Sequence, residues 1–129
     1  TLNIKKGKLY GLIGEVGCGK SSLIRAILSE MKQLSGGMVI NNNNSKSIAF
    51  CPQLPFIVND TVRNNILFGL EYNDKYYKKI LKAASLTHDL SIMAAGDMTE
   101  IGARGINLSG GQKARISFAR CLYNKLIGT

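Results

Sequence analysis

The sequence predicts an α/β fold, and three observations along the chain support this prediction. A short apolar run at residues 9–13 leads into a glycine-rich loop, as a buried strand would. The loop is followed by a segment, residues 20–32, whose apolar side chains recur at helical spacing. A second apolar run at residues 47–51 is a further candidate for a core strand. Strand, glycine loop and helix in this order are typical of one α/β unit.

The remaining elements are predicted in chain order from caps and periodicity. A short strand is expected at residues 38–40, after a Ser-Gly-Gly break. Asp60 is the predicted N-cap of a helix that ends at Leu67, and Asp74 is the predicted N-cap of the next helix. Residues 86–95 are expected to add a third short helix. The helix after Asp74 would present Tyr77, Ile80, Leu81 and Ala84 on one face, and a final helix capped by Ser109 would carry Ala114, Ser117, Phe118 and Cys121 on one side.

Length, composition and charge fit one small globular domain. The chain has 129 residues, 45% of them hydrophobic, and no apolar run approaches the roughly 20 residues that span a bilayer. It shows no secretory leader and begins with Thr1, so we expect a fragment or a processed chain. Its 17 basic and 8 acidic residues give a net charge of +9, and their scatter favours a solvated face over a nucleic-acid partner. Three cysteines without metal-type spacing indicate free thiols in a reducing compartment.

Residues 14–21, with the sequence GEVGCGKS, match the phosphate-binding pattern G-x-x-x-x-G-K-[S/T]. The glycines let the backbone approach phosphates, and the N–H groups of the loop and the following helix would form an anion site. The Lys20 ammonium is expected to reach the β- and γ-phosphates, the Ser21 hydroxyl to ligate Mg²⁺, and Ser22 to support the β- or α-phosphate. Cys18 is either a tolerated small residue or a thiol whose alkylation would block nucleotide binding. The predicted phosphate-binding residues are Gly14, Glu15, Val16, Gly17, Cys18, Gly19, Lys20, Ser21 and Ser22.

A second motif lies at residues 108–112, with the sequence LSGGQ. Together with the phosphate loop it resembles the nucleotide-binding domain of ATP-binding cassette (ABC) transporters. Residues 52–57 and 59–69 look like the Q-loop region of the C subfamily, the multidrug-resistance-associated group, which usually carries tryptophan where this chain has Phe56. The block at residues 96–107 is similar to the first of the two nucleotide-binding domains in that subfamily.

The resemblance implies a P-loop NTPase core of ABC type with an inserted helical subdomain. It divides the chain into a phosphate-loop part (residues 1–53), a Q-loop and helical part (residues 54–107), and the signature motif with its helix (residues 108–129). In the family the Q-loop glutamine, here Gln53, contacts Mg²⁺ and the attacking water, so it is the implied catalytic residue and a metal ligand beside Ser21. ATP and Mg²⁺ are the implied cofactors, and the signature residues that would face a nucleotide held by another domain are Ser109, Gly110, Gly111 and Gln112.

The resemblance further implies the ATP-binding part of a transporter that couples ATP binding and hydrolysis to solute export. The implied partners are a second nucleotide-binding domain, in a head-to-tail ATP sandwich, and the transmembrane domains of the same transporter. The expected location is the cytoplasmic face of a membrane, and no nucleic acid is expected. The sequence stops before the family's Walker B strand and its carboxylates, so we expect the chain alone to be inactive or very weak as an ATPase and poorly stable.

Two other functions stay open from the sequence. One is an ABC ATPase of translation or DNA maintenance, which the basic charge favours and which the transporter-like blocks at residues 53–69 and 96–102 disfavour. The other is a truncated, non-hydrolytic nucleotide-binding module. The family also uses a histidine near the γ-phosphate, but that residue follows the signature. His88 precedes it, so we expect a surface or capping residue.

Overall fold

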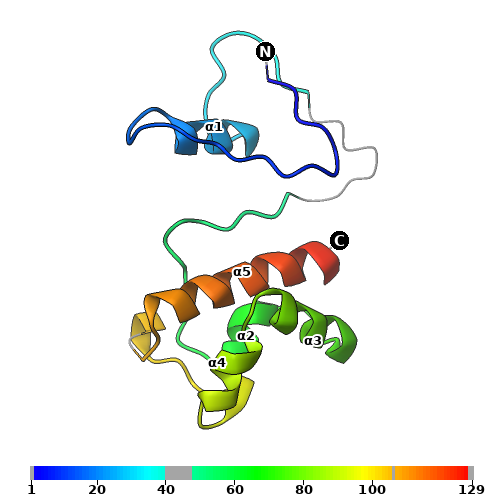
Figure 1. Cartoon of the computed structure of the whole chain (residues 1–129), viewed down its shortest axis with the longest axis vertical. Coiled ribbons are helices and arrows are strands. Elements are labelled where there is room, and N and C mark those ends of the chain that lie inside the picture. The colour runs from blue at the N-terminus through cyan, green and yellow to red at the C-terminus, as the bar shows by residue number, and fades with distance from the viewer. Residues whose placement is uncertain (1, 40–47, 106, 128–129) are drawn as a thin grey trace. The chain divides into compact units, whose positions relative to one another are not determined.

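The computed structural model describes residues 2–39, 48–105 and 107–127, and the chain divides into two compact units, Thr1–Asn43 and Asn44–Thr129. None of the helices in these described ranges is long and apolar enough to cross a membrane. The elements, labelled in Figure 1 where there is room, are α1 (Lys20–Ile27), α2 (Val62–Leu67), α3 (Asp74–Ala83), α4 (Thr87–Ile92), the short 3₁₀ helices η1 (Gly96–Met98) and η2 (Ala103–Gly105), and α5 (Gly110–Ile127).

The first unit contains the glycine-rich loop and α1. The helix begins at Lys20 as predicted, but it ends at Ile27 instead of continuing to residue 32. Two residues close it: the Leu28 N–H bonds to the Ile24 carbonyl at 3.0 Å, and Ser29 adopts the left-handed conformation with φ 61°. No residue between 2 and 39 is buried, and the apolar α1 side chains with the least exposure, Leu23, Ala26 and Ile27, are only partly buried.

The strands predicted from the apolar runs are not formed in the residues that the structure describes. Residues 9–13, 38–39 and 48–51 have no regular secondary structure, and residues 40 and 47 lie outside the described ranges. Leu9 and Ile13, which were expected in a buried strand, are exposed. A strand needs a neighbour that completes its ladder of hydrogen bonds, and none is paired with these segments within the described chain. The α/β fold therefore stays a prediction.

The second unit is helical, and its core lies between α2, α3 and α5. Figure 1 shows α5 running alongside α2 and α3, and both helices contact it. Burying a large apolar side chain stabilises a fold by about 1.5–3 kcal/mol, so these contacts hold the unit together. The most deeply buried side chains are Val62, Ile66, Tyr77, Ile80, Leu86, Ile101, Ile116, Ala119 and Tyr123.

One β interaction in the described residues joins the start of α2 to the segment before the signature motif. It is an isolated antiparallel bridge between Thr61 and Glu100. Beside it, the Ile101 N–H donates to the Asp60 carbonyl at 3.0 Å. The bridge therefore fixes how the chain at Asp60 and Thr61 lies against the chain at Glu100 and Ile101, although α2, α3 and α4 separate the two in the sequence.

The predicted helical elements of this unit are confirmed, but two caps are shifted by one residue. The cap of α2 is Thr61, whose hydroxyl accepts from the Asn64 N–H, and Asp60 lies one residue earlier. The cap of α3 is Asn73, so Asp74 is the first residue inside the helix. In both places two neighbouring residues carry a short side chain with a capping oxygen, and propensity does not choose between them. α4 falls within the range predicted for the third short helix.

The buried side of α5 differs from the predicted one. Ala114 and Phe118 are exposed and Cys121 is only partly buried, whereas Ser117 is buried as that face would require. Apolar residues occur around much of this helix, so periodicity alone did not identify the packed side. On α3 the predicted face is confirmed. The α5 side chains that enter the core are Ile116, Ala119 and Tyr123.

Candidate functional site

The phosphate loop at residues 14–21 leads directly into α1. Gly17 and Gly19 have φ values of +85° and +93°, in the left-handed region that favours glycine. Gly19 is the N-cap, and no side chain caps the helix. Helix geometry leaves the first N–H groups without intrahelical partners, and the positive end of the helix dipole lies at the same place. This helix start is therefore suited to hold an anion.

The Lys20 side chain folds back over the loop. Its ammonium donates to the carbonyl oxygens of Gly14 at 2.9 Å and Glu15 at 2.6 Å. It also lies 3.7 Å from the Cys18 sulfur, a weak acceptor. An ammonium has three donors, so the two carbonyl bonds hold the charge over the loop and leave one donor for a stronger acceptor such as a phosphate oxygen.

The rest of the loop fits a polyphosphate as well. A Cβ on Gly14 would lie 2.7 Å from the Cys18 sulfur, so any larger residue at position 14 would displace the exposed Cys18 side chain. Val16, Cys18, Ser21 and other loop residues are exposed, which leaves the loop open to a ligand. Backbone donors, one ammonium and two hydroxyls at the start of α1 thus lie along one accessible segment.

The donor set is also suited to Mg²⁺ bound together with a nucleotide. The Ser21 hydroxyl lies in the first turn of α1 and is a hard oxygen donor of the type that Mg²⁺ prefers. The described ranges contain no cluster of three or more His, Cys, Asp or Glu side chains that could hold a metal ion by themselves. Mg²⁺ is usually held by few protein ligands and by phosphate oxygens, so Ser21 would serve as one ligand beside the nucleotide.

The signature motif forms the start of α5 through a reciprocal capping box. The Ser109 hydroxyl accepts from the Gln112 N–H at 3.2 Å, and the Gln112 amide oxygen accepts from the Ser109 N–H at 2.9 Å. Ser109 is thus confirmed as the cap of this helix. The box leaves the N–H groups of Gly110 and Gly111 without intrahelical partners, because they occupy the first two helical positions. It also leaves the Ser109 hydroxyl proton free to donate.

A carboxylate on α4, that of Asp89, lies beside the capping box and hydrogen bonds to the Gln112 side chain. Asp89 is buried and receives two hydrogen bonds from the Arg115 guanidinium, at 2.6 and 2.8 Å. It also receives a longer one from the Gln112 amide nitrogen, at 3.4 Å. The Arg115 hydrogen bonds hold the pKa of Asp89 below its ordinary value, and the same pairing raises the pKa of Arg115. The Gln112 side chain is therefore held by Ser109 on one side and Asp89 on the other. Its predicted contact with a nucleotide stays untested.

Gln53 lies in the second unit, in a bend of the exposed chain before α2. Its side chain makes no hydrogen bond or ion pair among the described residues. It is thus available to a ligand, but its predicted catalytic and metal-binding roles stay untested. His88 is exposed near the start of α4, and its carbonyl accepts from the Ser91 hydroxyl. The prediction of a surface residue at His88 is confirmed.

Asp89 and Arg115 were not predicted as part of the site. They lie 26 residues apart in the sequence, and neither belongs to the motif that they support. An acidic residue in the first turn of a short helix is ordinarily a dipole partner, so Asp89 carried no separate signal. Only the tertiary fold, which places Asp89 of α4 beside Arg115 of α5, brings the two together.

Comparison with known proteins relates the chain to one family along nearly its whole length. The profile of the family described as "ABC transporter" matches residues 1–126. The chain is 52% identical over 123 residues to ATP-binding cassette sub-family C member 2 of Rattus norvegicus, which covers 95% of the chain. It is 48% identical over 124 residues to ATP-binding cassette sub-family C member 10 of Homo sapiens, and 45% identical over 136 residues to an ATP-dependent bile acid permease of Saccharomyces cerevisiae, each covering 96% of the chain. The chain spans 8% of the length of each of these relatives.

Proposed function

The chain belongs to the ABC transporter family, and from this premise we propose that it is the ATP-binding part of a membrane transporter that exports solutes. The observation that carries the proposal is that one family-matched chain contains two separate helix starts that are each suited to bind an anion. One is the uncapped helix start behind the phosphate loop, and the other is the glycine start of α5. A protein that bound one nucleotide by itself would need only the first.

At the first site the loop residues bind the phosphates of ATP. Backbone N–H groups between Gly14 and Gly19 and at the start of α1 donate to phosphate oxygens. Lys20 keeps its bonds to the loop carbonyls and directs its remaining donor to the β- and γ-phosphates. Ser21 would ligate Mg²⁺, and Ser22 would support the α- or β-phosphate. Bound Mg²⁺ would neutralise charge that develops on the phosphate oxygens during hydrolysis.

At the second site the signature residues bind an ATP that a partner domain holds. Ser109 donates its hydroxyl proton, and Gly110 and Gly111 donate backbone N–H groups to the γ-phosphate. Gln112 holds Ser109 in place through the capping box. Two such domains in head-to-tail contact would enclose two ATP molecules, and transmembrane domains of the same transporter would respond to this closure. The site of action is the cytoplasmic face of a membrane.

We propose that hydrolysis needs groups in addition to those of these 129 residues. Gln53 is proposed to orient the attacking water through its free amide and to contact Mg²⁺. In the family the general-base carboxylate follows the signature motif, and no aspartate or glutamate follows Gln112 in these 129 residues, so we propose that this group is not among them. The isolated polypeptide is therefore proposed to bind ATP and to hydrolyse it very weakly or not at all.

We further propose that the apolar runs at residues 9–13 and 47–51 are strands of an α/β core when neighbouring strands are present. Their alternation with a phosphate loop and helix supports this assignment. The proposed parts are residues 1–53 for the phosphate-loop core, residues 54–107 for the Q-loop and helical subdomain, and residues 108–129 for the signature helix.

The test measures nucleotide binding and hydrolysis by the complete protein in membrane vesicles. Lys20→Ala is expected to abolish Mg²⁺-dependent ATPase activity at this site and to weaken binding of a fluorescent ATP analogue, because the ammonium over the loop is lost. Gly110→Asp is expected to lower hydrolysis while analogue binding at the phosphate loop stays within twofold, because a carboxylate at the second site repels the γ-phosphate. ATPase and export activities that neither substitution changes would contradict the proposal.

A further inference from the structure

Two of the three cysteines, Cys51 and Cys121, come close together within the second unit. The Cys51 sulfur lies 3.7 Å from the hydroxyl of Ser117, which is buried on α5. Cys121 follows Ser117 by four positions on the same helix, and side chains at this spacing lie on one helix face with Cβ atoms about 5–6 Å apart. The Cys51 sulfur therefore lies against the face of α5 that carries Cys121.

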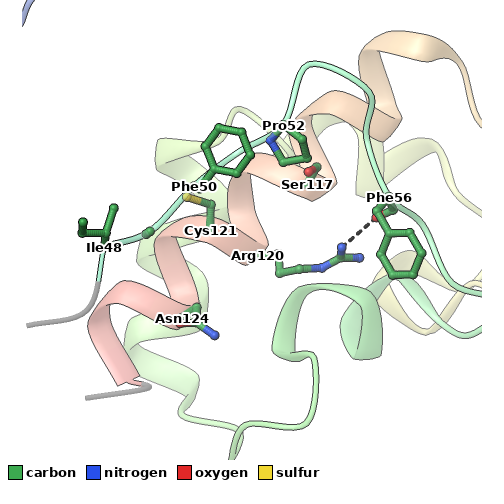
Figure 2. A pocket seen from close by; sticks show the side chains of 9 residues that line it. Ile48, Phe50, Pro52, Phe56, Ser117, Arg120, Cys121 and Asn124 are labelled. Carbon is green, nitrogen blue, oxygen red and sulfur yellow. Dashed lines mark hydrogen bonds between the residues drawn. The ribbon is translucent and has the colours of Figure 1, made fainter. Parts of the chain in front are cut away.

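A cavity between residues 48–52 and α5 gives the Cys121 side chain room to turn. The volume of this cavity is about 190 Å³, and its lining includes Cys121 together with Phe50 and Pro52, the two residues that flank Cys51. Figure 2 shows the Cys121 sulfur beside Phe50, on the side of α5 that faces this segment. The Cys121 side chain can therefore rotate toward Cys51 through open space.

The backbone around Cys51 is held by few contacts. In the described parts of the chain, the backbone of residues 48–55 makes no hydrogen bond. Pro52 has no N–H group, so a strand that ended at Cys51 would not continue its pairing past that residue. A disulfide requires Cβ atoms about 3.5–4.5 Å apart. A shift of residues 50–52 toward Cys121 reaches that separation without the loss of a backbone hydrogen bond.

The surroundings of the two sulfurs favour different roles in an oxidation. Cys51 is exposed, so an oxidant in solution reaches it directly, and the Ser117 hydroxyl is placed to donate to its thiolate. Cys121 is partly buried, and burial raises the pKa of its thiol, as does negative charge on Cys51. Because the thiolate is the reactive form of cysteine, Cys51 is the sulfur that reacts first and Cys121 is the one that follows.

We propose that Cys51 and Cys121 are a modification site that forms a reversible disulfide when the protein meets hydrogen peroxide. The Cys51 thiolate attacks one oxygen of the peroxide and the O–O bond breaks, which gives a Cys51 sulfenic acid and hydroxide. The hydroxide takes up the proton that Cys51 lost and becomes water. The Cys121 thiolate then attacks the sulfenic sulfur, the S–O bond breaks, and the second hydroxide becomes water with the proton of Cys121. The two thiols are thereby oxidised by two electrons and one peroxide is reduced to two waters.

The first step of this sequence prepares the second. A sulfenic acid at Cys51 is neutral, so its formation removes the negative charge that opposes ionisation of the Cys121 thiol. The completed bond closes a loop of about 70 residues around α2, α3 and α4, and a covalent link between such distant residues restricts the unfolded chain. In a reducing compartment a disulfide of this kind is transient, and thiols reverse it.

Mass spectrometry of the complete protein in native membrane vesicles tests this bond directly. The vesicles are treated with hydrogen peroxide, the remaining free thiols are blocked with iodoacetamide, and the protein is digested with trypsin. Cleavage after lysine and arginine places Cys51 in the peptide of residues 47–63 and Cys121 in the peptide of residues 121–125. We expect these two peptides as a linked pair, which disappears when dithiothreitol is added before the iodoacetamide.

Two serine variants are the matched controls. Cys121→Ser should abolish the linked pair, and the sulfenic acid at Cys51 should then persist and be captured by dimedone. Cys18→Ser removes the other exposed thiol of the chain and should leave the yield of the linked pair unchanged. In the wild type, the link from Cys51 to Cys121 should be at least about tenfold more abundant than links from Cys51 to any other cysteine, because neighbouring groups react far faster than separate ones.

The wild-type result decides the inference even if a variant fails to accumulate. Recovery of Cys51 after peroxide only as a carbamidomethylated or singly oxidised residue, with no link to Cys121, would overturn it. A link from Cys51 to Cys18 in place of Cys121 would overturn it as well. The bond is detected without any measure of ATP hydrolysis, so the inference does not rest on the proposed function. Absence of ATPase activity that depends on Lys20 would reject that function and leave the disulfide site standing.

Discussion

The substitution Tyr123→Phe removes a single oxygen from the core of the second unit. Tyr123 is 0% exposed, and its hydroxyl donates to the Glu71 carbonyl at 2.6 Å and accepts from the Asn73 N–H at 2.8 Å. Without this oxygen both backbone groups lose their partner, and a buried unpaired group costs about 1–3 kcal/mol. Water is expected to replace part of the lost hydrogen bonding, because Glu71 and Asn73 are exposed residues. We therefore predict a loss of about 2 kcal/mol in the free energy of unfolding.

Tyr77→Phe is the matched comparison for this prediction. Tyr77 is 2% exposed and packs against Tyr123 with ring centres 6.1 Å apart. Its hydroxyl has no hydrogen-bond partner among the described residues, although burial and the nearby Asp97 carboxylate raise its pKa. Removal of that oxygen leaves no group unpaired, so the free energy of unfolding should change by less than about 0.5 kcal/mol or increase.

Urea unfolding of the purified protein, followed by circular dichroism at 222 nm, measures both variants against the wild type. The urea concentration at the midpoint of unfolding should fall for Tyr123→Phe and stay unchanged for Tyr77→Phe, and the dependence of the free energy of unfolding on urea concentration should be similar in both. Equal destabilisation by the two substitutions would refute the reasoning, because it would mean that the hydroxyl bonds of Tyr123 contribute no more than the unpaired hydroxyl of Tyr77.

Three further predictions concern the signature region. The pKa of Asp89 is lowered by Arg115 from its ordinary value of 3.8, so its contribution to stability is full above that value and is lost as the pH falls through the lower folded-state pKa. Asp89→Asn should therefore remove part of the acid-dependent loss of stability in unfolding curves measured between neutral and acidic pH, and an unchanged pH profile would contradict this. Gly105→Ala should cost about 1–2 kcal/mol in urea unfolding, because φ is +67° and the new Cβ would lie 3.0 Å from the Lys113 Cε; a neutral result would show that the turn relaxes. Ser109→Ala should cost about 1 kcal/mol in the same assay through loss of the cap, whereas Ser109→Asn should retain most of that stability.

Local patterns were sufficient to predict the two motifs and most helices of the second unit. A capping box involves residues only three positions apart, so Ser109 was identified as a cap from the sequence alone. The errors at Asp60 and Asp74 are also local, because each has a competing cap beside it. The strands are a different case. Their hydrogen bonds come from other segments, so a favourable apolar run does not form a strand without a paired neighbour.

The sequence by itself determined the phosphate loop, the signature cap and the family, because each depends on residue types at short, fixed spacing. The tertiary structure alone decided which distant side chains meet. Arg120 reaches Phe56 across 64 positions, and Arg115 reaches Asp89 across 26. Such pairs depend on which sides of α2, α4 and α5 face one another, and several sides of α5 are apolar enough to be buried. The choice among them is made by the joint packing of all the helices, which no local pattern contains.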